Sequence, residues 1–297
     1  MDRSMKPLKR ARGFLAGCAA AGLAAVAISQ MVPVAATAAD SRQAGSAASA
    51  GTPAAAGPAE LRMIPIPPGA FPLQVPGEFL DRGMPVDPPV IEAVAAAGRS
   101  IMSRQVSQAE YAQCVQAGAC KRLDKGFRDL AAPHLPAVGV SWLDATAYAA
   151  WMSARTGRTW RLPDYAEWVR AAADRYRMEG PLPSDPGDPS VRWLAEYERE
   201  ASRGRGRIKP AQPFGHFGAN ALGLVDVAGN VWEWTNTCFA SHTVGALPLP
   251  PRENCGVRIL AGAHVAAMPD FIRDPRNGAC SIGLPPSNLG FRLVLEG

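Results

Sequence analysis

Reactive side chains gather toward the C-terminus of the sequence, where His264 and Cys280 belong to no recognisable structural motif. A histidine and a cysteine thiolate can hold a metal ion or form a nucleophile with its base. Asp270 and Arg273 add a carboxylate and a guanidinium to the same stretch. These four residues are our catalytic candidates. The competing interpretation is a hydrogen-bonded histidine, an inert buried cysteine and a salt-bridged surface loop over 270–276.

The spacing of the six cysteines indicates which of them are paired. One lies near the N-terminus, which leaves an odd number in the rest of the chain. In an oxidising compartment most of these are expected to form disulfides. The spacing favours two local bridges, Cys114 with Cys120 and Cys238 with Cys255. Cys280 then remains as the unpaired thiol.

The N-terminal segment has the composition of an export signal. A basic stretch over 6–12 precedes an apolar, Ala-rich run over 14–28, and Ala36-Thr37-Ala38 then offers small residues to a signal peptidase. We therefore expect a cleavable signal peptide over 1–39 and a periplasmic location. Two alternatives stay open: retention of the segment as a membrane anchor, and lipidation at Cys18.

Composition separates a linker from a folded domain. Residues 40–60 are small and Pro-containing and include no aromatic or large aliphatic side chain, so we expect a disordered linker there. From 61 to 297 aromatic residues, Gly and Pro interleave without a second such break. The 47% hydrophobic content supports a sizeable core. We predict one domain over 61–297.

The charge of the chain argues against nucleic-acid binding. The formal net charge is +5, but much of that excess lies in the basic stretch near the N-terminus, and the remainder is close to neutral. A phosphate-binding Gly-rich loop, a His-Glu-x-x-His motif and a Gly-x-Ser-x-Gly motif are all missing from the sequence. We expect a periplasmic protein or small-molecule client, no nucleic acid, and no stable membrane insertion after signal cleavage.

Three segments carry helix signals. Ser107 with Glu110 forms a capping box, and Gly118 marks the stop of that helix. The second helix spans 141–157 and the third spans 164 to about 175. Short runs over 61–66, 258–260 and 291–294 read as strands among many turns. The pattern predicts an α+β chain with much irregular structure.

Several motifs resemble one known family. They are Val140-Ser141-Trp142-Leu143-Asp144-Ala145, Arg161-Leu162-Pro163, Gly229-Asn230-Val231-Trp232-Glu233-Trp234 and Gly290-Phe291-Arg292. In this order they resemble the formylglycine-generating enzymes, or sulfatase-modifying factors. The resemblance implies a single α+β domain related to C-type lectins, low in regular secondary structure and often held by calcium.

The resemblance also implies the ligands for that calcium, Asn230 and Glu233. An amide oxygen and a carboxylate beside a tight Gly turn suit a hard cation. The alternative is that Asn230 caps a turn while Glu233 pairs with a buried arginine such as Arg292.

The copper site of the family is incomplete in this sequence. The active enzymes are known to bind copper through two cysteines five residues apart, and those positions fall here on Ala267 and Ile272. Thiolates suit Cu(I) because both are soft, so copper is not expected here. His264 stands where the family has a small hydroxyl. The missing cysteines argue against a formylglycine-generating oxidase and leave open whether any catalysis remains.

The resemblance to exported relatives without these cysteines suggests three functions. The first is a periplasmic accessory or maturation factor, similar to the proteins associated with copper nitrite reductase and denitrification. The second is an oxidase with altered chemistry acting on a periplasmic small molecule or peptide, as in pyoverdine maturation. The third is a non-catalytic, lectin-like binding module.

Overall fold

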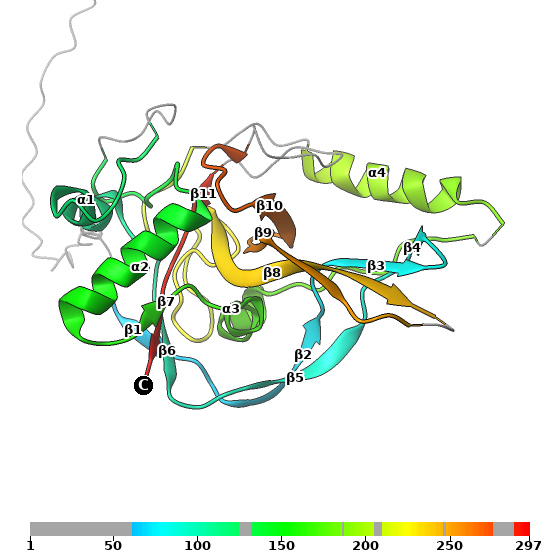
Figure 1. The fold of residues 1–297 in the computed structure, drawn as a ribbon, viewed down its shortest axis with the longest axis horizontal. Helices are drawn as coiled ribbons and strands as arrows, with labels where there is room; N and C mark the ends of the chain where they lie inside the picture. Colours follow the sequence, from blue (N-terminus) through cyan, green and yellow to red (C-terminus); the bar gives the residue numbers. More distant parts are fainter. Residues whose placement is uncertain (1–60, 125–131, 186, 205–209, 246–247, 276–287) are drawn as a thin grey trace, which may run out of the picture. The chain divides into compact units, whose positions relative to one another are not determined.

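In the computed structural model, the described residues are 61–124, 132–185, 187–204, 210–245, 248–275 and 288–297. All of them belong to one compact unit, 53–297. Short strands, helices and long irregular connections alternate along it (Figure 1). The predicted signal peptide, the predicted linker and Cys280 lie outside the described residues. No helix in the described ranges combines the length and apolar character needed to cross a bilayer.

One sheet joins segments that are far apart in the sequence. Its strand order is β1 (Met63–Pro65), β6 (Arg99–Met102), β12 (Val294–Glu296) and β7 (Trp160–Arg161), and every neighbouring pair is antiparallel. Strand β12 therefore lies between two strands that precede it by more than a hundred positions. This arrangement makes the C-terminal residues part of the centre of the sheet.

A second sheet is built around a long hairpin. Strand β8 (Trp232–Val244) pairs with β9 (Arg252–Ala261), and β10 (Ala266–Pro269), β3 (Glu78–Asp81) and β4 (Met84–Pro85) extend the sheet on either side. Strand β11 (Leu289–Gly290) runs parallel to the start of β8. The register of β8 against β9 shifts on both sides of Cys238, and the two strands form a curved ribbon (Figure 1). Strands β2 (Gly69–Gln74) and β5 (Val90–Ala95) make a separate pair.

The three predicted helices are confirmed together with their caps. Helix α1 (Gln108–Gln116) has a capping box formed by Ser107 and Glu110. Helix α2 (Trp142–Thr156) starts from Ser141 and ends at Gly157, whose φ of 66° suits a residue without a side chain. Helix α3 (Tyr165–Ala172) continues as a 3₁₀ turn over Ala173–Arg175.

The sequence missed one helix and misplaced one strand. Helix α4 (Ser190–Gly204) exposes Trp193, Leu194 and Tyr197, so its apolar residues do not mark a buried face. The predicted strand over 291–294 is wrong as a single element, because β11 ends at Gly290 and β12 begins at Val294. Between them the backbone oxygens of Phe291 and Leu293 accept hydrogen bonds from Val106 and Met102, respectively. The α+β class is confirmed.

Both disulfides predicted from the spacing are present. Cys114 bonds to Cys120 at the end of α1, and Cys238 bonds to Cys255 across the β8–β9 hairpin. The two large buried clusters are centred on different helices. One packs α1 and α2 against Trp234 and Phe291, and the other packs α3 against β2, β5 and β9.

Candidate functional site

A buried ion pair lies at the start of β8. Glu233 and Arg292 both have 0% side-chain exposure, and Arg292 donates Nε to Oε2 at 2.6 Å and Nη2 to Oε1 at 2.7 Å. Gln105 Nε2 also donates to Oε1 at 2.7 Å, and Trp168 Nε1 donates to Oε2 at 2.9 Å. Four N–H groups therefore surround one carboxylate. The pair ties together β8, α3, the chain after β6 and the segment between β11 and β12.

These contacts bear on the predicted calcium ligands. Both carboxylate oxygens of Glu233 accept hydrogen bonds from N–H donors. The Asn230 side chain bonds to the backbone of Gln212: its Oδ1 accepts from N at 2.9 Å, and its Nδ2 donates to O at 2.8 Å. Glu233 is buried at 0% exposure with two N–H donors on each carboxylate oxygen, and the Asn230 amide is engaged at both ends, so the two residues do not fit a calcium ion as a pair of ligands. The structure supports the alternative, in which Glu233 pairs with Arg292. Calcium binding by this chain stays a prediction.

The segment after β10 is anchored to α2 and to β9. Arg273 Nη2 donates to Asp144 Oδ1 at 2.6 Å, and Nη1 donates to the Arg122 carbonyl at 3.1 Å. The backbone of Asp270 accepts from Leu143 N at 3.4 Å and donates to the Gly256 carbonyl at 2.9 Å. Arg273 is thus held in a salt bridge, as the competing interpretation of this stretch proposed.

His264 lies against an aromatic side chain. Its ring meets Trp232 edge to face with centroids 5.2 Å apart, and Nδ1 lies 2.9 Å from the Val265 carbonyl. The backbone at Gly262 also lies close to Trp232, because a Cβ there would be 2.8 Å from the indole. The Trp232 Nε1 atom is buried without a hydrogen-bond partner among the described residues. Since Cys280 lies outside these residues, a contact between His264 and Cys280 stays a prediction.

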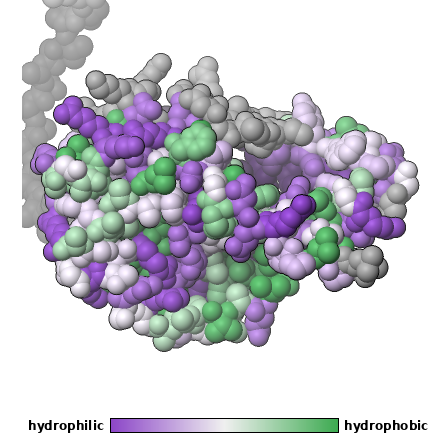
Figure 2. Space-filling view, in the orientation of Figure 1, coloured by the Kyte–Doolittle hydropathy of each residue, from purple (hydrophilic) through white to green (hydrophobic). Residues whose placement is uncertain are grey.

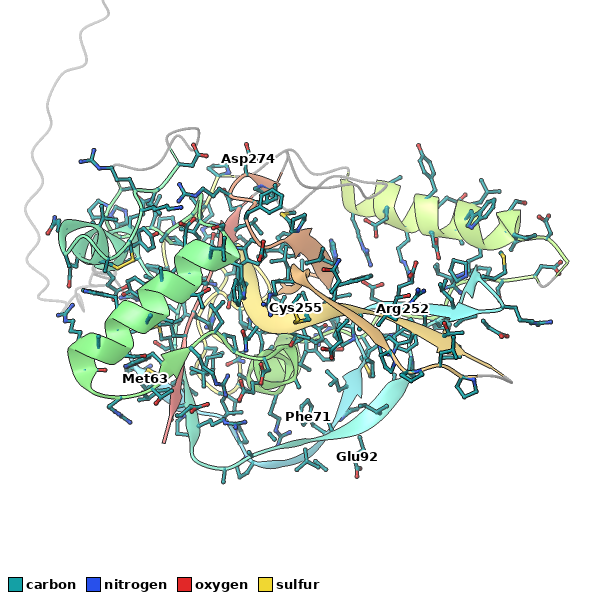
Figure 3. The ribbon with its side chains drawn as sticks, in the orientation of Figure 1. Met63, Phe71, Glu92, Arg252, Cys255 and Asp274 are labelled. Atoms are coloured by element: carbon teal, nitrogen blue, oxygen red, sulfur yellow. A yellow bond between two sulfur atoms is a disulfide. The ribbon has the colours of Figure 1, made fainter. Side chains whose placement is uncertain are left out.

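Sequence reasoning missed a second cluster, which surrounds the Cys238–Cys255 disulfide on β8 and β9 (Figure 3). Arg258 pairs in register with Cys238 and donates Nη1 to its Sγ at 3.2 Å. The Arg258 guanidinium also lies 3.9 Å from the centre of the Trp142 ring. Burial lowers the pKa of Arg258 below its ordinary value, and Asp270 opposes this change. The only sequence signal was the position of Arg258 on the strand that carries Cys255.

Glu253 completes this cluster without forming a metal site. One carboxylate oxygen and both sulfur atoms of the disulfide lie within 4.8 Å of one another. Thiolates, not bonded disulfide sulfurs, are the cysteine ligands of metals. With the bridge intact, the three residues do not form a metal site.

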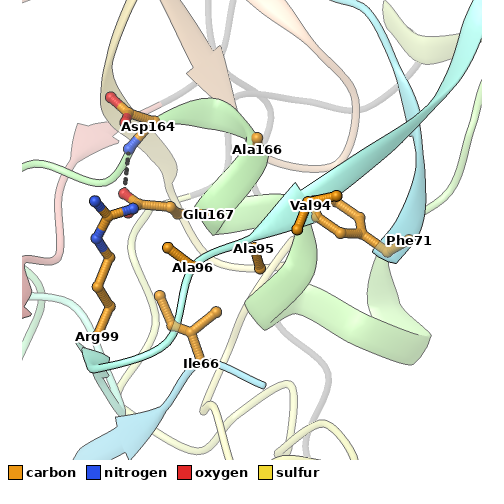
Figure 4. Close-up of a pocket in the computed structure, with 9 residues that line it drawn as sticks. All are labelled: Ile66, Phe71, Val94, Ala95, Ala96, Arg99, Asp164, Ala166 and Glu167. Carbon is orange, nitrogen blue, oxygen red and sulfur yellow. Dashed lines mark hydrogen bonds and ion pairs between the residues drawn. The ribbon is translucent and has the colours of Figure 1, made fainter. Parts of the chain in front are cut away.

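A small cavity of ≈ 140 Å³ opens beside α3 (Figure 4). Glu167 lies at its edge and bonds to Arg161 at 2.6 and 2.7 Å, to Arg99 at 2.9 Å and to the backbone N of Asp164 at 2.9 Å. Burial acts to raise the pKa of Glu167, but the hydrogen bonds and charges of its partners outweigh burial and hold the pKa below its ordinary value. Burial, and then the charge of Glu167, raise the pKa of Asp164. The cavity is therefore walled by an ion cluster that stabilises the fold.

Replacing Glu167 by Gln is expected to remove part of the acid sensitivity of the fold. A carboxylate with a lowered folded pKa contributes stability above its unfolded value, near 4.5, and loses it as the pH falls through the folded pKa. The difference in unfolding free energy between wild type and variant should be largest from pH 5 to pH 7, in urea titrations, and should shrink below about pH 4. Asp164, whose pKa is raised, acts in the opposite sense.

The control is Glu92→Gln on the exposed face of β5, which should change stability by less than about 0.5 kcal/mol at any of these pH values. A difference between wild type and Glu167→Gln that stays constant down to pH 3 would contradict the assignment.

The surface around these sites has a mixed character. Hydrophilic and hydrophobic residues intersperse over the face shown in Figure 2. A larger hollow of ≈ 460 Å³ lies between the β3–β4 turn and α4, where Asp81, Asp87 and Arg192 contribute to its lining.

The structure is a mixed α+β domain in which the Trp-Glu-Trp segment at the start of β8 is bonded to the buried Arg292, and this arrangement agrees with a sulfatase-modifying-factor-like fold. The family comparison agrees: residues 50–297 match the Sulfatase-modifying factor enzyme 1-like domain, and the chain belongs to that family.

Curated relatives include several formylglycine-generating enzymes. That of Thermomonospora curvata is 32% identical over 222 residues, which cover 70% of this chain and 71% of that enzyme. The Streptomyces coelicolor enzyme is 32% identical over 171 residues, covering 54% of this chain and 52% of the enzyme. In the Mycobacterium tuberculosis enzyme the match, at 37% identity, covers 42% of each chain. The chain thus spans about half the length of the latter two relatives.

A solved structure supports the same fold. The structure of PvdO from Pseudomonas aeruginosa is similar with a TM-score of 0.52 and 22% identity, over 82% of this chain and 100% of that one. A likeness at this level of identity shows the fold alone. The prediction of a single formylglycine-generating-enzyme-like domain is confirmed.

Proposed function

We propose that this chain is an exported accessory factor that helps to mature a periplasmic protein by binding it, without the copper-dependent oxidase chemistry of its relatives. The observation that carries the proposal concerns the two positions where the resemblance expects copper ligands. Ala267 is exposed on β10, Ile272 is half-buried in the segment that follows, and neither has a side-chain atom that could hold Cu(I).

The surroundings of these positions support a binding role. Arg273 is engaged with Asp144 and the Arg122 carbonyl, so the nearby charged groups are used to dock the segment. Phe271, which directly precedes Ile272, is 64% exposed, and Leu143 at the start of α2 is 50% exposed. Exposed apolar residues beside an anchored loop suit contact with a protein client.

A copper nitrite reductase in a denitrifying system is the client we propose. Support for it comes from the sequence resemblance of 254–258, 270–274 and 285–292 to the accessory proteins of those enzymes. Calcium binding, signal cleavage after 38 or 39 and a periplasmic location are part of the same proposal.

A second candidate is an oxidase with altered chemistry acting on a small molecule or peptide. His264 favours this second candidate. It occupies the position at which the family has a small hydroxyl, it is half-buried, and its ring meets Trp232 edge to face. A histidine in that position could bind a metal or move a proton. The lectin-like binding module stays open as a third function.

One purification separates the accessory factor from the oxidase. The protein is isolated from periplasm without chelator, and metals are measured in wild type, His264→Ala and Cys280→Ala. The accessory role predicts calcium as the one stoichiometric metal, unchanged by either substitution, and no aldehyde on a Cys-x-Pro-x-Arg peptide. Copper or another transition metal lost in both variants, with substrate-dependent oxygen uptake, would establish the oxidase instead.

Client maturation is measured in cells that express a copper nitrite reductase with and without this chain. We expect lower copper content and lower reductase activity when the chain is missing, and full recovery with either His264→Ala or Cys280→Ala. Equal copper content in both strains would refute this client.

A further inference from the structure

The two disulfides differ in their exposure. Cys255 is exposed and Cys238 is half-buried, so a thiol in solution can reach the hairpin bridge. In the other bridge Cys114 is 0% exposed inside the core beside α1, and Cys120 is half-buried. Attack on a disulfide requires access to one sulfur atom along the bond. The hairpin bridge meets this requirement at Cys255.

The hairpin bridge is also electrically asymmetric. Arg258 Nη1 donates to Cys238 Sγ at 3.2 Å, and the same nitrogen donates to the Asn236 carbonyl at 2.8 Å. Within the described part of the chain, no carboxylate forms a salt bridge with Arg258; Asp270 acts on it only through its charge, and its Nε is buried without a hydrogen-bond partner. A guanidinium whose charge is not neutralised by a bonded carboxylate stabilises negative charge on the sulfur that it contacts.

The position of Arg258 is fixed by the surrounding structure. Its Cζ lies 3.9 Å from the centre of the Trp142 ring, and Trp142 is held in turn by a hydrogen bond from its Nε1 to the Thr235 carbonyl at 3.1 Å. A positioned charge loses little conformational freedom when it binds a developing thiolate. The contact with Cys238 is therefore a built feature of the β8–β9 hairpin.

We infer that the Cys238–Cys255 disulfide exchanges with the thiols of a polypeptide client. The client thiolate attacks Cys255 Sγ and forms a mixed disulfide there. The Cys238–Cys255 bond breaks, and its electron pair leaves on Cys238 Sγ as a thiolate that Arg258 stabilises. A second client thiol then displaces Cys255, so the client dithiol is oxidised to a disulfide and this bridge is reduced to two thiols.

This reaction goes beyond the proposed function and does not depend on it. The hairpin disulfide would be the redox group whichever polypeptide client is bound. The leaving sulfur departs faster when its thiolate is stabilised, which gives the exchange its direction. Glu253 sets a preference among thiols. Its carboxylate lies within 4.8 Å of both sulfurs, so it repels anionic thiols that approach the bridge.

The first test measures how fast each disulfide opens in the full-length protein. Wild type, Arg258→Gln and Arg258→Lys are treated with the neutral thiol 2-mercaptoethanol at pH 7, quenched with an alkylating agent and digested for mass spectrometry. We expect the Cys238–Cys255 bridge to open at least about 10-fold faster than the Cys114–Cys120 bridge. Arg258→Gln should lower the opening rate of Cys238–Cys255 about 3- to 10-fold and leave that of Cys114–Cys120 unchanged. Arg258→Lys should retain part of the rate.

Arg252→Gln is the matched control, because Arg252 is an exposed arginine on the same strand and, within the described part of the chain, makes no hydrogen bond to either sulfur. It should leave both rates unchanged. Equal opening rates of the two bridges, or an Arg258→Gln variant with the wild-type rate, would overturn the proposal. Urea titration of each variant checks folding, and Arg258→Lys keeps the test valid if Arg258→Gln folds poorly.

The second test identifies the sulfur that is attacked. Alkylation traps the transient mixed disulfide with 2-mercaptoethanol. We expect the 2-mercaptoethanol on Cys255 and the alkyl group on Cys238. An adduct on Cys238 with the alkyl group on Cys255 would refute the assigned direction of attack. Replacing 2-mercaptoethanol by the more anionic glutathione should lower the opening rate of the Cys238–Cys255 bridge in the wild type. With glutathione, the Glu253→Gln variant should open about 2- to 5-fold faster than the wild type. None of these measurements involves a nitrite reductase. A negative result would therefore refute the disulfide exchange and leave the proposed accessory role untouched.

Discussion

Replacing Arg292 by Leu is expected to lower the free energy of unfolding by about 3–5 kcal/mol. The substitution removes the guanidinium that makes two bonds to Glu233 and leaves this carboxylate buried at 0% exposure. An uncompensated buried charge costs far more than an exposed one. The measurement is the urea unfolding curve, followed by circular dichroism.

Arg82→Leu is the control, because Arg82 also lies near a carboxylate, Asp81, but its side chain is 87% exposed. It should change the unfolding free energy by less than about 1 kcal/mol. The double variant Arg292→Leu with Glu233→Met should recover part of the loss, since no charge is then left buried. An Arg292→Leu protein as stable as wild type would show that Glu233 does not depend on this partner.

Replacing Phe291 by Ala should cost about 3–5 kcal/mol of unfolding free energy. Phe291 is 0% exposed and meets Tyr111 and Tyr148 edge to face, with ring centroids 6.3 and 5.4 Å apart. The substitution opens a cavity where α1 and α2 pack on the segment between β11 and β12. Phe271→Ala, at a residue that is 64% exposed, should change stability by less than about 0.5 kcal/mol. Similar losses in both variants would contradict this account of the core.

Local signals in the sequence predicted the local structure well. The caps at Ser107 and Ser141 and the stop at Gly157 placed α1 and α2, because a cap is a contact between residues three or four positions apart. Short spacing likewise predicted both disulfides. Helix α4 was missed although Trp193, Leu194 and Tyr197 recur at helical spacing. In the structure these side chains are exposed, so the pattern lies on the open face of the helix.

The candidate site depended on contacts that spacing does not reveal. The sequence offered Arg292 as a partner of Glu233, but not the donors Gln105 and Trp168, which come from two other parts of the chain. Without them the carboxylate resembled a calcium ligand. Asp144 illustrates the same limit: one oxygen caps α2 at Ser141, and the other, unforeseen, receives Arg273.

The place of β12 in its sheet has a consequence for biosynthesis. Strand β12 (Val294–Glu296) lies between β6 and β7, and β6 in turn carries β1. During translation the ribosome therefore has to add residue 296 and release it from its exit tunnel before this sheet can close. Such long-range pairing slows folding, because the closure of a large loop precedes the contacts that compensate for it. Until then the nascent chain lacks the strand that joins β6 to β7.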